Sequence, residues 1–479
     1  MAKAHRSLKW GQIYDNLYGF IKLTDTEEKI INSPFYQRLR WIKQLGFATY
    51  IFPGAEHTRF AHAIGVLHSA DQMVRAIGKD VPDSKLFDVK ATDEATLFHK
   101  SCRLAALLHD IGTFPFSHSI EESYIRHGFA LEKKGKLPGK QLPNSHEHLG
   151  SYIVKNTNYE NGITRILSDA GIDYKSLSKY IKGESDNLVA NQLLHSDLDA
   201  DRMDYLVRDA RHTGIQYGHI DRDYILFNLT TFKTPDGKEI LGIRDKAVHA
   251  VEDFLLARFS WYSQVVKNSS SAKYDILAAH IASYLLEEKL ITPFHELLDL
   301  TCHDPERFFS FNDVYFMNLI QRLYLDRKIK DPQILEKMRM LIYRIPPHTV
   351  RLPEFESRIL EMNDKGEVPQ KAKLVAKIQD KVEEIEHLFK KKGKGKAWIL
   401  ADIPSRDVTF SKGYKESLKN KNSALLIRDP IKVISKDSAS LLVNQKNAII
   451  SRMCKYINFI PNVYANNAAM ELLKSHKLI

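Results

Sequence analysis

An apolar helical run that ends in a histidine and an aspartate is the feature that most constrains this chain. In LLHDIGTFPFSH (residues 107–118), His109 and Asp110 lie in the last turn of the run, and Gly112 and Pro115 then break the helix. The residues before them recur at helical spacing and indicate a buried face: Leu104, Ala105, Leu107 and Leu108. Burying an imidazole beside an ionised carboxylate is costly unless both have partners. Two interpretations stay open at this point, a capped helix end with a surface His–Asp pair and a site for a bound cation.

The spacing of apolar residues predicts mostly helices from Phe35 to about Lys330. Before that stretch, GQIYDNLYGFIKL predicts short β pieces followed by the start of a helix. One hairpin interrupts the helices, because ILFNLTTF and EILGIRD flank KTPDGK, in which Asp236 and Gly237 suit a tight turn. Residues 128–148 (GFALEKKGKLPGKQLPNSHEH) are expected to form a long loop, and loops of this length are often functional.

The C-terminal third differs in pattern from the rest. Residues 366–392 predict a charged amphipathic helix, and the Lys/Gly run Lys390–Lys396 ends it; we interpret this run as a solvated junction, with a nucleic-acid patch as the alternative. After it, KAWILADIP, ALLIRDPIKVI and AIISRMCKYINFI indicate alternating strands and helices. The predicted fold class is mainly α, with small β-hairpins and a C-terminal α+β subdomain. The expected division is a core at 1–330, a helical connector at 331–395 and the α+β subdomain at 396–479.

Composition limits the partners and the location of the protein. The net charge of +11 and the isoelectric point near 9.1 favour anionic partners, either nucleic acid or small polyphosphates. The three cysteines are too few and too far apart for a zinc spacing or a disulfide framework. No run of about 18 apolar residues occurs, and the start lacks the apolar region of a secretory signal. We therefore expect a cytoplasmic protein with no membrane partner.

Three further segments carry residues that commonly bind metals. HTRFAHAIGVLHSADQM places His62 on a helix one turn after Arg59, and NSHEHLGSYIV places His146, Glu147 and His148 at a helix entrance. In DADRMDYLVRDARHTG, helical spacing puts four residues on one face: Asp201, Tyr205, Asp209 and His212. Two imidazoles and two carboxylates suit Fe, Mn, Zn or Ni better than Ca. A cation of this kind lowers the pKa of water enough for attack on phosphorus near neutral pH.

The order His62, His109–Asp110, Asp201 resembles the signature of the HD-domain phosphohydrolases. Longer strings resemble the deoxynucleoside triphosphate (dNTP) triphosphohydrolases, or dGTPase-like enzymes, in the group that includes the vertebrate sterile-alpha-motif/HD-domain enzyme: FYQRLRWIKQLGFATYIFPGAEHTRFAHAIGV, AALLHDIGTFPFSH, HEHLGS and DADRMDYLVRDARHTGI. The resemblance covers about residues 10–270 well and 396–479 loosely. It implies a stand-alone, bacterial-type member, with a helical HD core and an N-terminal regulatory segment in residues 1–330.

The resemblance also implies roles for individual residues. One divalent transition metal would be bound by His62, His109, Asp110 and Asp201. Proton transfer and its orientation would fall to His118, His146, Glu147 and Glu121. Substrate contacts would come from Gln44, Arg59, Arg202, Tyr205, Asp209 and Arg258.

Within that substrate set, Tyr205 would pack against the sugar and exclude a 2′-hydroxyl, while Gln44 and Asp209 would contact the 3′-hydroxyl. The three arginines would bind the triphosphate, which carries its own Mg²⁺. The alternative for Arg59, Arg258 and Asp209 is a buried ion-pair network.

Two departures from the family pattern bear on these expectations. In the family string HDxGHGPFSH, a histidine that does not bind the metal itself stands where this chain has Thr113. The resemblance therefore carries over the class of reaction and not the details of its mechanism. Relatives bind a guanine nucleotide between subunits through an aspartate where this chain has Asn32, and an amide suits thymine, uracil or adenine at least as well. The implied regulatory residues are Asn32, Gln37, Arg40, Arg244 and Lys246. We therefore expect a homo-oligomer, a tetramer, assembled by a (d)NTP other than GTP.

The preferred hypothesis is hydrolysis of dNTPs to deoxynucleoside and inorganic triphosphate, because Tyr205 and Asp209 match the sugar contacts of that reaction. Such an enzyme would act in dNTP-pool control or in defence against phage. One alternative is another HD phosphohydrolase, a nucleotide phosphodiesterase or a hydrolase of signalling nucleotides. Another is a nucleic-acid-binding or nuclease protein, which the Lys390–Lys396 run favours.

Overall fold

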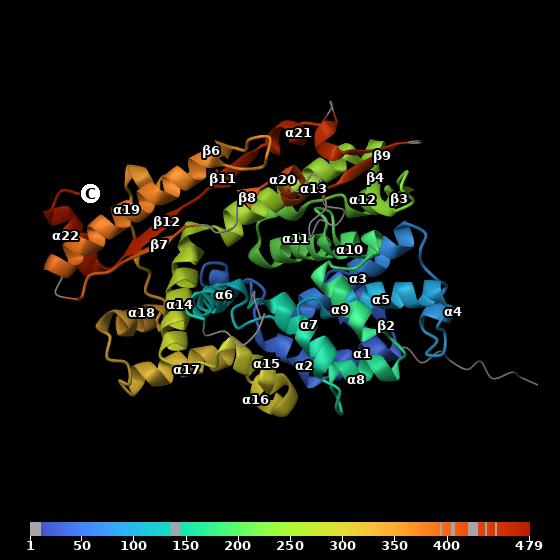
Figure 1. Ribbon diagram of the computed structural model, residues 1–479, viewed down its shortest axis with the longest axis horizontal. Coiled ribbons are helices and arrows are strands. Elements are labelled where there is room, and N and C mark those ends of the chain that lie inside the picture. The colour runs from blue at the N-terminus through green and yellow to red at the C-terminus, as the bar shows by residue number, and fades with distance from the viewer. Residues whose placement is uncertain are drawn as a thin grey trace, which may run out of the picture.

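The computed structural model describes residues 11–135, 144–392, 395–403, 408–419, 430–435, 438–445 and 448–479. Helices make up most of this part of the chain, which confirms the predicted fold class (Figure 1). The helices up to residue 287 are α1 (Asp25–Asn32), α2 (Pro34–Gln37), α3 (Arg59–Ala76), α4 (Asp83–Leu86), α5 (Glu94–Leu108), α6 (His118–Lys133), α7 (His146–Asn156), α8 (Ile163–Asp169), α9 (Tyr174–Lys182), α10 (Leu188–His195), α11 (Ala200–Thr213), α12 (Arg222–Phe227), α13 (Val248–Trp261) and α14 (Ser269–Glu287). The later helices are α15 (Phe294–His303), α16 (Pro305–Phe309), α17 (Asp313–Leu325), α18 (Pro332–Ile342), α19 (Pro369–Lys392), α20 (Lys412–Lys419), α21 (Ile450–Met453) and α22 (Asn467–Ser475). Within the described residues, no helix combines the length and the apolar character needed to cross a membrane.

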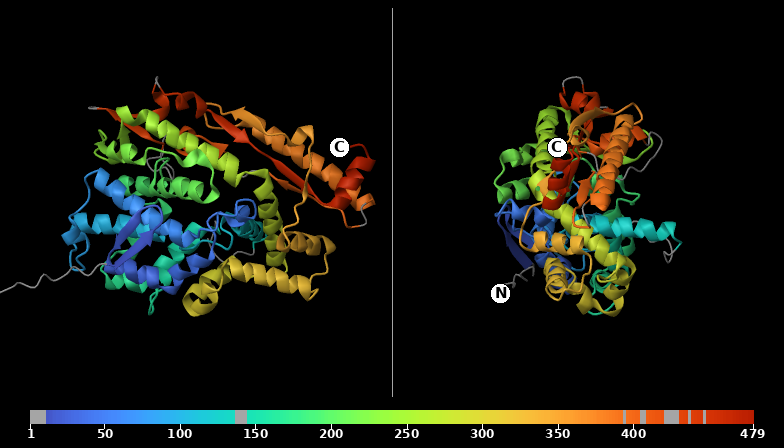
Figure 2. Two further views of the ribbon diagram at one scale, coloured as in Figure 1. Left: turned by 180° about the vertical axis from the view of Figure 1, so that it is seen from behind. Right: turned by 90° about the vertical axis from the view of Figure 1, so that its left-hand side faces the viewer.

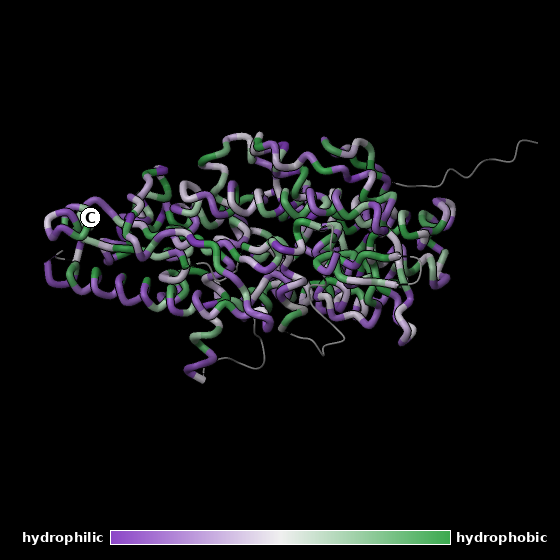
Figure 3. The backbone as a smooth tube through the Cα atoms, turned by 90° about the horizontal axis from the view of Figure 1, so that it is seen from above, coloured by the Kyte–Doolittle hydropathy of each residue, from purple (hydrophilic) through white to green (hydrophobic). Residues whose placement is uncertain are grey.

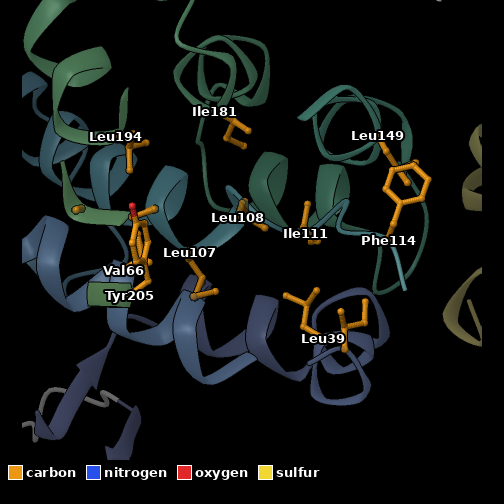
Figure 4. Close-up of a cluster of buried hydrophobic side chains, with 14 of the residues drawn as sticks. Leu39, Val66, Leu107, Leu108, Ile111, Phe114, Leu149, Ile181, Leu194 and Tyr205 are labelled. Carbon is orange, nitrogen blue, oxygen red and sulfur yellow. The ribbon is translucent and has the colours of Figure 1, made fainter. Parts of the chain in front are cut away.

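The centre of the helical body is α3, which packs against α5 and α11. Helix α5 begins after Asp93, whose side chain accepts the backbone N–H of Thr96, and it ends at Leu108. Figure 4 shows Val66 of α3, Leu107 and Leu108 of α5 and Tyr205 of α11 directed into one apolar cluster. Burying each such side chain contributes about 1.5–3 kcal/mol, so this packing fixes the three helices against one another.

The sheets are small and formed mainly by hairpins and C-terminal strands. The strands are β1 (Gly11–Asp15), β2 (Gly19–Leu23), β3 (Leu229–Lys233), β4 (Glu239–Arg244), β5 (His348–Thr349), β6 (Arg358–Glu361), β7 (Ile399–Asp402), β8 (Val408–Thr409), β9 (Lys432–Ser435), β10 (Ser438–Leu441), β11 (Tyr456–Phe459) and β12 (Asn462–Ala465). The order of one sheet is β10-β9-β4-β3, in which β9 runs parallel to β4 and Ile243 lies opposite Val433. C-terminal strands therefore extend a hairpin that belongs to the helical body.

Two apolar clusters connect the C-terminal part to the rest of the structure. The larger cluster fills the helical body and also includes Trp398, Phe410, Val433 and Cys454. The smaller cluster holds α19, with Ile378 and Ile385, against β6, β11 and β12. Figures 1 and 2 show the orange and red C-terminal segments along one side of the helical body. In Figure 3 the hydrophilic colour is prominent at the end of the molecule near the C-terminus. The expected three-part division of the chain stays a prediction.

Two local expectations were wrong. The predicted loop at 128–148 starts later, because α6 continues to Lys133 through the good helix formers Ala130 and Leu131, and His146 already belongs to α7. Residues 136–143 of that segment lie outside the described residues. ILFNLTTF was predicted to be a strand along its whole length, but β3 begins only at Leu229. The residues before it belong to α12, which buries Ile225 in the core. The turn between β3 and β4 does contain Gly237 with a φ of 81°.

Candidate metal centre and its surroundings

The structure brings together the four residues expected to bind a metal, from three helices. His62 lies in α3, His109 and Asp110 follow directly on α5, and Asp201 lies in the first turn of α11. His62 Nε2 is 3.0 Å from Asp201 Oδ1 and 3.9 Å from Asp110 Oδ2. His109 Nε2 is 3.5 Å from Asp110 Oδ2 and 3.8 Å from Asp201 Oδ1. One nitrogen of each imidazole and one oxygen of Asp201 thus lie within 4.8 Å of one another, and Asp110 Oδ2 lies beside both imidazoles.

The outer nitrogen of each imidazole is held by an acceptor. His109 Nδ1 donates to the backbone oxygen of Ala106 at 2.7 Å, and His62 Nδ1 contacts Asp204 Oδ2 at 2.8 Å. In a neutral ring with a protonated Nδ1, Nε2 carries a lone pair that can bind a cation. His109 Nε2 is buried and has no hydrogen-bond partner. A divalent cation would satisfy this nitrogen, so the residues present fit a metal ion.

The electrostatics of this centre also favour a cation. Burial alone would raise the pKa of Asp110, but the charges of Arg59 and the neighbouring imidazoles hold the pKa of this carboxyl well below its usual range. Burial likewise opposes ionisation of Asp201, and its hydrogen bond with His62 outweighs that effect and lowers the pKa. Both carboxylates are therefore ionised at neutral pH and present negative charge beside the two imidazoles.

A buried ion pair supports His62 from behind. Asp204 accepts two hydrogen bonds from Arg208, at 2.8 and 2.9 Å, and Arg208 also contacts Asp15 of β1 at 3.0 Å. Gly65 leaves the room for this pair, because a Cβ at residue 65 would lie 1.9 Å from Asp204 Oδ1. Asp204 was not among the expected site residues, although it lies three residues after Asp201 on α11.

We expect Asp204→Asn to weaken metal binding about 10–100-fold, because a neutral amide no longer stabilises the donor nitrogen of His62. Metal titration by isothermal calorimetry measures the affinity, and thermal unfolding reports the loss of the pair with Arg208. Asp223→Asn, at an exposed position of α12, is the matched control. An unchanged affinity in Asp204→Asn would contradict this supporting role.

Two further histidines share one carboxylate next to the metal centre. Glu121 in α6 contacts Nδ1 of His118 at 2.7 Å and Nδ1 of His146 at 2.7 Å, and it accepts the backbone N–H of His146 at 2.8 Å. His146 Nε2 lies 3.9 Å from Asp110 Oδ1, and Glu147 Oε2 lies 3.5 Å from His146 Nδ1. Burial lowers the pKa of His146, but Glu121 and Glu147 outweigh it and raise the pKa to about 9. This group can hold and move protons, and His118, Glu121 and His146 could also hold a cation.

The turn before His118 is fixed by Asp313, a residue that carries no signal of this role in the sequence. Phe116 and Ser117 have φ of 50° and 57°, a conformation that costs non-glycine residues free energy. Asp313, at the start of α17, accepts the backbone N–H of Phe116 at 2.6 Å and that of Lys43 at 2.9 Å. The Ser117 hydroxyl donates to the backbone oxygen of Lys43 at 2.8 Å. Asp313 therefore ties the turn before His118 to the segment that carries Gln44.

Several expected substrate residues already have protein partners. Arg59 contacts Asp110 at 2.5 Å and Ser117 at 3.0 Å, which is the ion-pair alternative for this residue. Both carboxylate oxygens of Asp209 are used, one by His57 Nε2 and one by Trp261 Nε1, each at 2.8 Å. The Tyr205 ring packs on Trp261, with ring centroids 4.5 Å apart, and lies 6.5 Å from the ring of His62. Arg202 contacts Asp199 and the backbone oxygen of Ser196, and Arg258 donates to two backbone oxygens.

Unpartnered polar atoms remain around these residues. Gln44 Oε1 and His57 Nδ1 are buried without a hydrogen-bond partner, and so are Nε of Arg202 and both Nε and Nη2 of Arg258. Hydrogen bonds connect Gln44 to Asp209 through His57. The backbone N–H of Gln44 donates to the backbone oxygen of His57 at 3.0 Å, and the His57 ring contacts Asp209. Unsatisfied buried polar groups are rare in proteins, and a polar ligand would supply partners for them.

The structure places the expected regulatory residues in two separate groups. Asn32 ends α1 and is exposed, Gln37 donates to the backbone oxygen of Ile31 at 2.7 Å, and Arg40 donates to Gln37 Oε1 at 2.7 Å. Arg244 and Lys246 are exposed at the end of β4. In Figure 1, α2 and β4 lie on different sides of the molecule. One chain therefore does not bring the two groups together.

Comparisons with known proteins agree with this centre. Residues 59–209 match the model of the HD domain, so the chain contains an HD domain. An uncharacterized protein of Methanocaldococcus jannaschii is 32% identical over 66% of this chain and 59% of its own length. An uncharacterized protein of Bacillus subtilis is 33% identical over 53% of this chain and 50% of its own. The human deoxynucleoside triphosphate triphosphohydrolase SAMHD1 is 27% identical over 53% and 41%. The chain thus spans about half the length of these relatives.

Solved structures share the fold. A hypothetical protein of Aquifex aeolicus superimposes with a TM-score of 0.66 at 22% identity, covering 98% of this chain and 99% of that one. A phosphohydrolase of Bacteroides thetaiotaomicron gives 0.62 at 20% identity, covering 96% and 100%. At these identities the likeness extends to the fold alone.

Proposed function

We propose that this protein hydrolyses dNTPs to a deoxynucleoside and inorganic triphosphate. One observation carries the proposal: His62, His109, Asp110 and Asp201 converge, with His109 Nε2 unpartnered, directly beside the pair of histidines on Glu121. The similarity to proteins described as dNTP triphosphohydrolases supports it. An HD centre next to proton-carrying groups has the parts that phosphate-ester hydrolysis needs.

The chain's residues take the following roles in this proposal. His62, His109 and Asp201, whose donor atoms lie within 4.8 Å of one another, hold one divalent cation, and Asp110, 3.5 Å from His109 Nε2, completes the set. The mixed nitrogen and oxygen donors suit Fe, Mn, Zn or Ni. When bound, such an ion polarises phosphate oxygens and lowers the pKa of water. Glu121 holds Nδ1 of both His118 and His146, which leaves their Nε2 atoms to give a proton to the leaving sugar oxygen. Mg²⁺ accompanies the nucleotide.

The reaction is tested by its products. The purified protein is incubated with each dNTP singly and in pairs, with Mg²⁺ and with Mn²⁺, and the products are separated by chromatography. We expect deoxynucleoside and inorganic triphosphate. Deoxynucleoside monophosphate with pyrophosphate would overturn the proposal, because attack would then have broken a different bond.

A second candidate is another HD phosphohydrolase, and the contacts of Asp209 favour it. Both oxygens of this carboxylate are already used by His57 and Trp261, so the expected contact with a 3′-hydroxyl needs one of them to be exchanged. In that case cyclic or signalling nucleotides should be cleaved and dNTPs should not. The same chromatographic assay with those nucleotides separates the two functions.

Regulation would depend on a second copy of the chain. The exposed Arg40 and the exposed Arg244 and Lys246 carry like charges that repel in a closed interface unless a polyphosphate lies between them. We propose a homotetramer that a (d)NTP other than GTP stabilises by mass action, because Asn32 offers no second acceptor for guanine.

Mass photometry with each nucleotide in turn tests this assembly. We expect the mass to increase with a thymine, uracil or adenine nucleotide and not with GTP. Asn32→Asp should shift the preference towards guanine. Assembly of the unaltered protein by GTP alone would show that our interpretation of Asn32 is wrong, and a mass that no nucleotide changes would remove the regulatory site.

A further inference from the structure

The turn that leads into His118 has a backbone conformation that its own residues disfavour. Phe116 and Ser117 both have a positive φ, 50° and 57°, although neither is a glycine. Residues with a Cβ rarely adopt this region, so the conformation persists only where surrounding contacts impose it. Helix α6 begins at His118, directly after the turn. The His118 side chain is 56% exposed, so its direction depends strongly on the backbone that carries it.

Two carboxylates from outside the HD domain hold the chain on both sides of His118. Asp313, at the start of α17, accepts the backbone N–H of Phe116 at 2.6 Å, two residues before His118. Asp275 of α14 accepts a hydrogen bond from the hydroxyl of Ser119 at 2.6 Å, one residue after it. Figure 1 shows α14 next to α6, against which it packs. Both carboxylates come later in the chain than the part that matches the HD domain.

Close packing surrounds the same turn. The ring of Phe116 is stacked on that of Phe47, with centroids 4.1 Å apart and an interplanar angle of 7°. A Cβ at Gly46 would lie 2.9 Å from the backbone oxygen of Phe116 and 3.0 Å from Ser119 Oγ. The segment before Phe47 can therefore approach the turn this closely only with a glycine at residue 46.

Both carboxylates are held at a cost in free energy. Burial raises the pKa of Asp313 to about 7 and, despite the hydrogen bond from Ser119, that of Asp275 to about 6. The groups that donate to them are neutral: the backbone N–H groups of Phe116 and Lys43 and the hydroxyl of Ser119. Carboxyl groups kept in unfavourable surroundings are frequent at functional sites, so a role beyond stability is expected for them.

We propose that Asp313 and Asp275 are positioning residues for His118. By fixing the residues on either side of it, they set the place from which the imidazole, oriented by Glu121, gives its proton to the leaving oxygen. The inference rests on the proposed function in one respect, the role of His118 as proton donor. Neither carboxylate takes part in bond breaking, and two helices outside the HD domain complete its active site.

Asp313→Asn tests the first carboxylate, because an amide has a single acceptor oxygen and cannot accept both backbone N–H groups. The assay uses the phosphate ester that the product analysis identifies as substrate. We expect kcat to fall roughly 10²-fold, the loss that a displacement of about 1 Å causes, while KM and the bound metal stay unchanged. Asp331→Asn is the matched control, because Asp331 also accepts two backbone N–H groups, at the start of α18, and should alter none of the three values.

A double-variant comparison separates positioning from a general loss of structure. His118→Ala should retain residual turnover, since proton transfer supplies only part of the rate enhancement. If Asp313 acts through His118, Asp313→Asn should cause no further loss of kcat in the His118→Ala background, because no imidazole is left to be placed. A loss by the same factor in both backgrounds would overturn the role of Asp313, and so would an unchanged kcat in Asp313→Asn alone.

Ser119→Ala tests the second carboxylate without a change of charge, because it removes only the hydroxyl that donates to Asp275. We expect kcat to fall with KM unchanged, and no further fall in the His118→Ala background. An unchanged kcat in Ser119→Ala would remove Asp275 from the proposal.

Hydrogen exchange gives a readout that needs no activity. Asp313→Asn should speed the exchange of the Phe116 and Lys43 amides, because both lose their acceptor or share a weaker one. Unchanged exchange would show that Asp313 does not hold the turn. Faster exchange in a protein that cleaves no dNTP rejects the proposed function alone, whereas dNTP hydrolysis with unchanged kcat in both Asp313→Asn and Ser119→Ala rejects the positioning role alone.

Discussion

Replacing His109 with alanine should abolish turnover and leave the fold intact. The imidazole has one hydrogen bond, to the backbone oxygen of Ala106, and its Nε2 has no partner, so little folding free energy depends on it. Its side chain is 14% exposed at the end of α5, so its loss does not open a cavity within the core. A cation contributes several kcal/mol of charge stabilisation to phosphate chemistry, so we expect a loss of roughly 10³-fold or more.

Three measurements on the same preparation check this expectation. Triphosphate release should fall to background, the bound metal determined by mass spectrometry should fall with it, and the midpoint of thermal unfolding should stay within a few degrees. His303→Ala, at an exposed position of α15, should change none of the three. Normal turnover by His109→Ala, or a full metal content, would reject the metal assignment.

The single variant is a cleaner test than replacing His109 and Asp110 together. Asp110 is the partner of Arg59 at 2.5 Å, and both side chains are buried. Removing one member of a buried pair leaves the other charge uncompensated and costs about 3–5 kcal/mol. A double variant would therefore mix loss of the metal with loss of stability.

The helices of the metal centre were predictable because their signals are local. The 3.6-residue spacing of apolar side chains around His62, His109 and Asp201 predicts three helices whose polar residues lie at defined positions. The expectation that these residues converge came from the family resemblance. Spacing within one helix carries no information about its distance from another helix. The ends of the helices were predicted less well than their positions. Helix α6 extends past the predicted start of the loop because its local sequence also favours a helix.

Contacts between distant segments had no signal in the sequence. Asp313 looks like an ordinary residue at a helix start, and only the packing of α17 brings it to the N–H groups of Lys43 and Phe116. Likewise, nothing in the sequence places β9 beside β4 or Lys412 beside Tyr262. From the sequence, the partner of Arg59 could be a phosphate or a carboxylate. The contact with Asp110 arises because α3 packs against α5, which the sequence does not specify.

Replacing Tyr205 with alanine should let ribonucleotides compete with deoxyribonucleotides. The Tyr205 ring is 8% exposed and is held on Trp261, on the same helix face as Asp201 and Asp209. In the proposed function the sugar packs against this ring and the ring excludes a 2′-hydroxyl, since burying a hydroxyl without a partner costs about 1–3 kcal/mol. The ratio of kcat/KM for dGTP to that for GTP should therefore fall about 5–150-fold in Tyr205→Ala.

The expected effect depends on the aromatic ring of Tyr205 and not on its hydroxyl group. Tyr205→Phe is therefore the matched control and should keep the preference for dGTP over GTP. Truncating a buried aromatic side chain also destabilises the core, by about 3–5 kcal/mol. The ratio should for that reason be measured well below the unfolding midpoint of the variant, where both substrates meet the same folded fraction and the loss of stability cancels. If the unaltered protein already cleaves GTP and dGTP equally, or if Tyr205→Ala leaves the ratio unchanged, Tyr205 does not border the sugar, and its packing on Trp261 is part of the core alone.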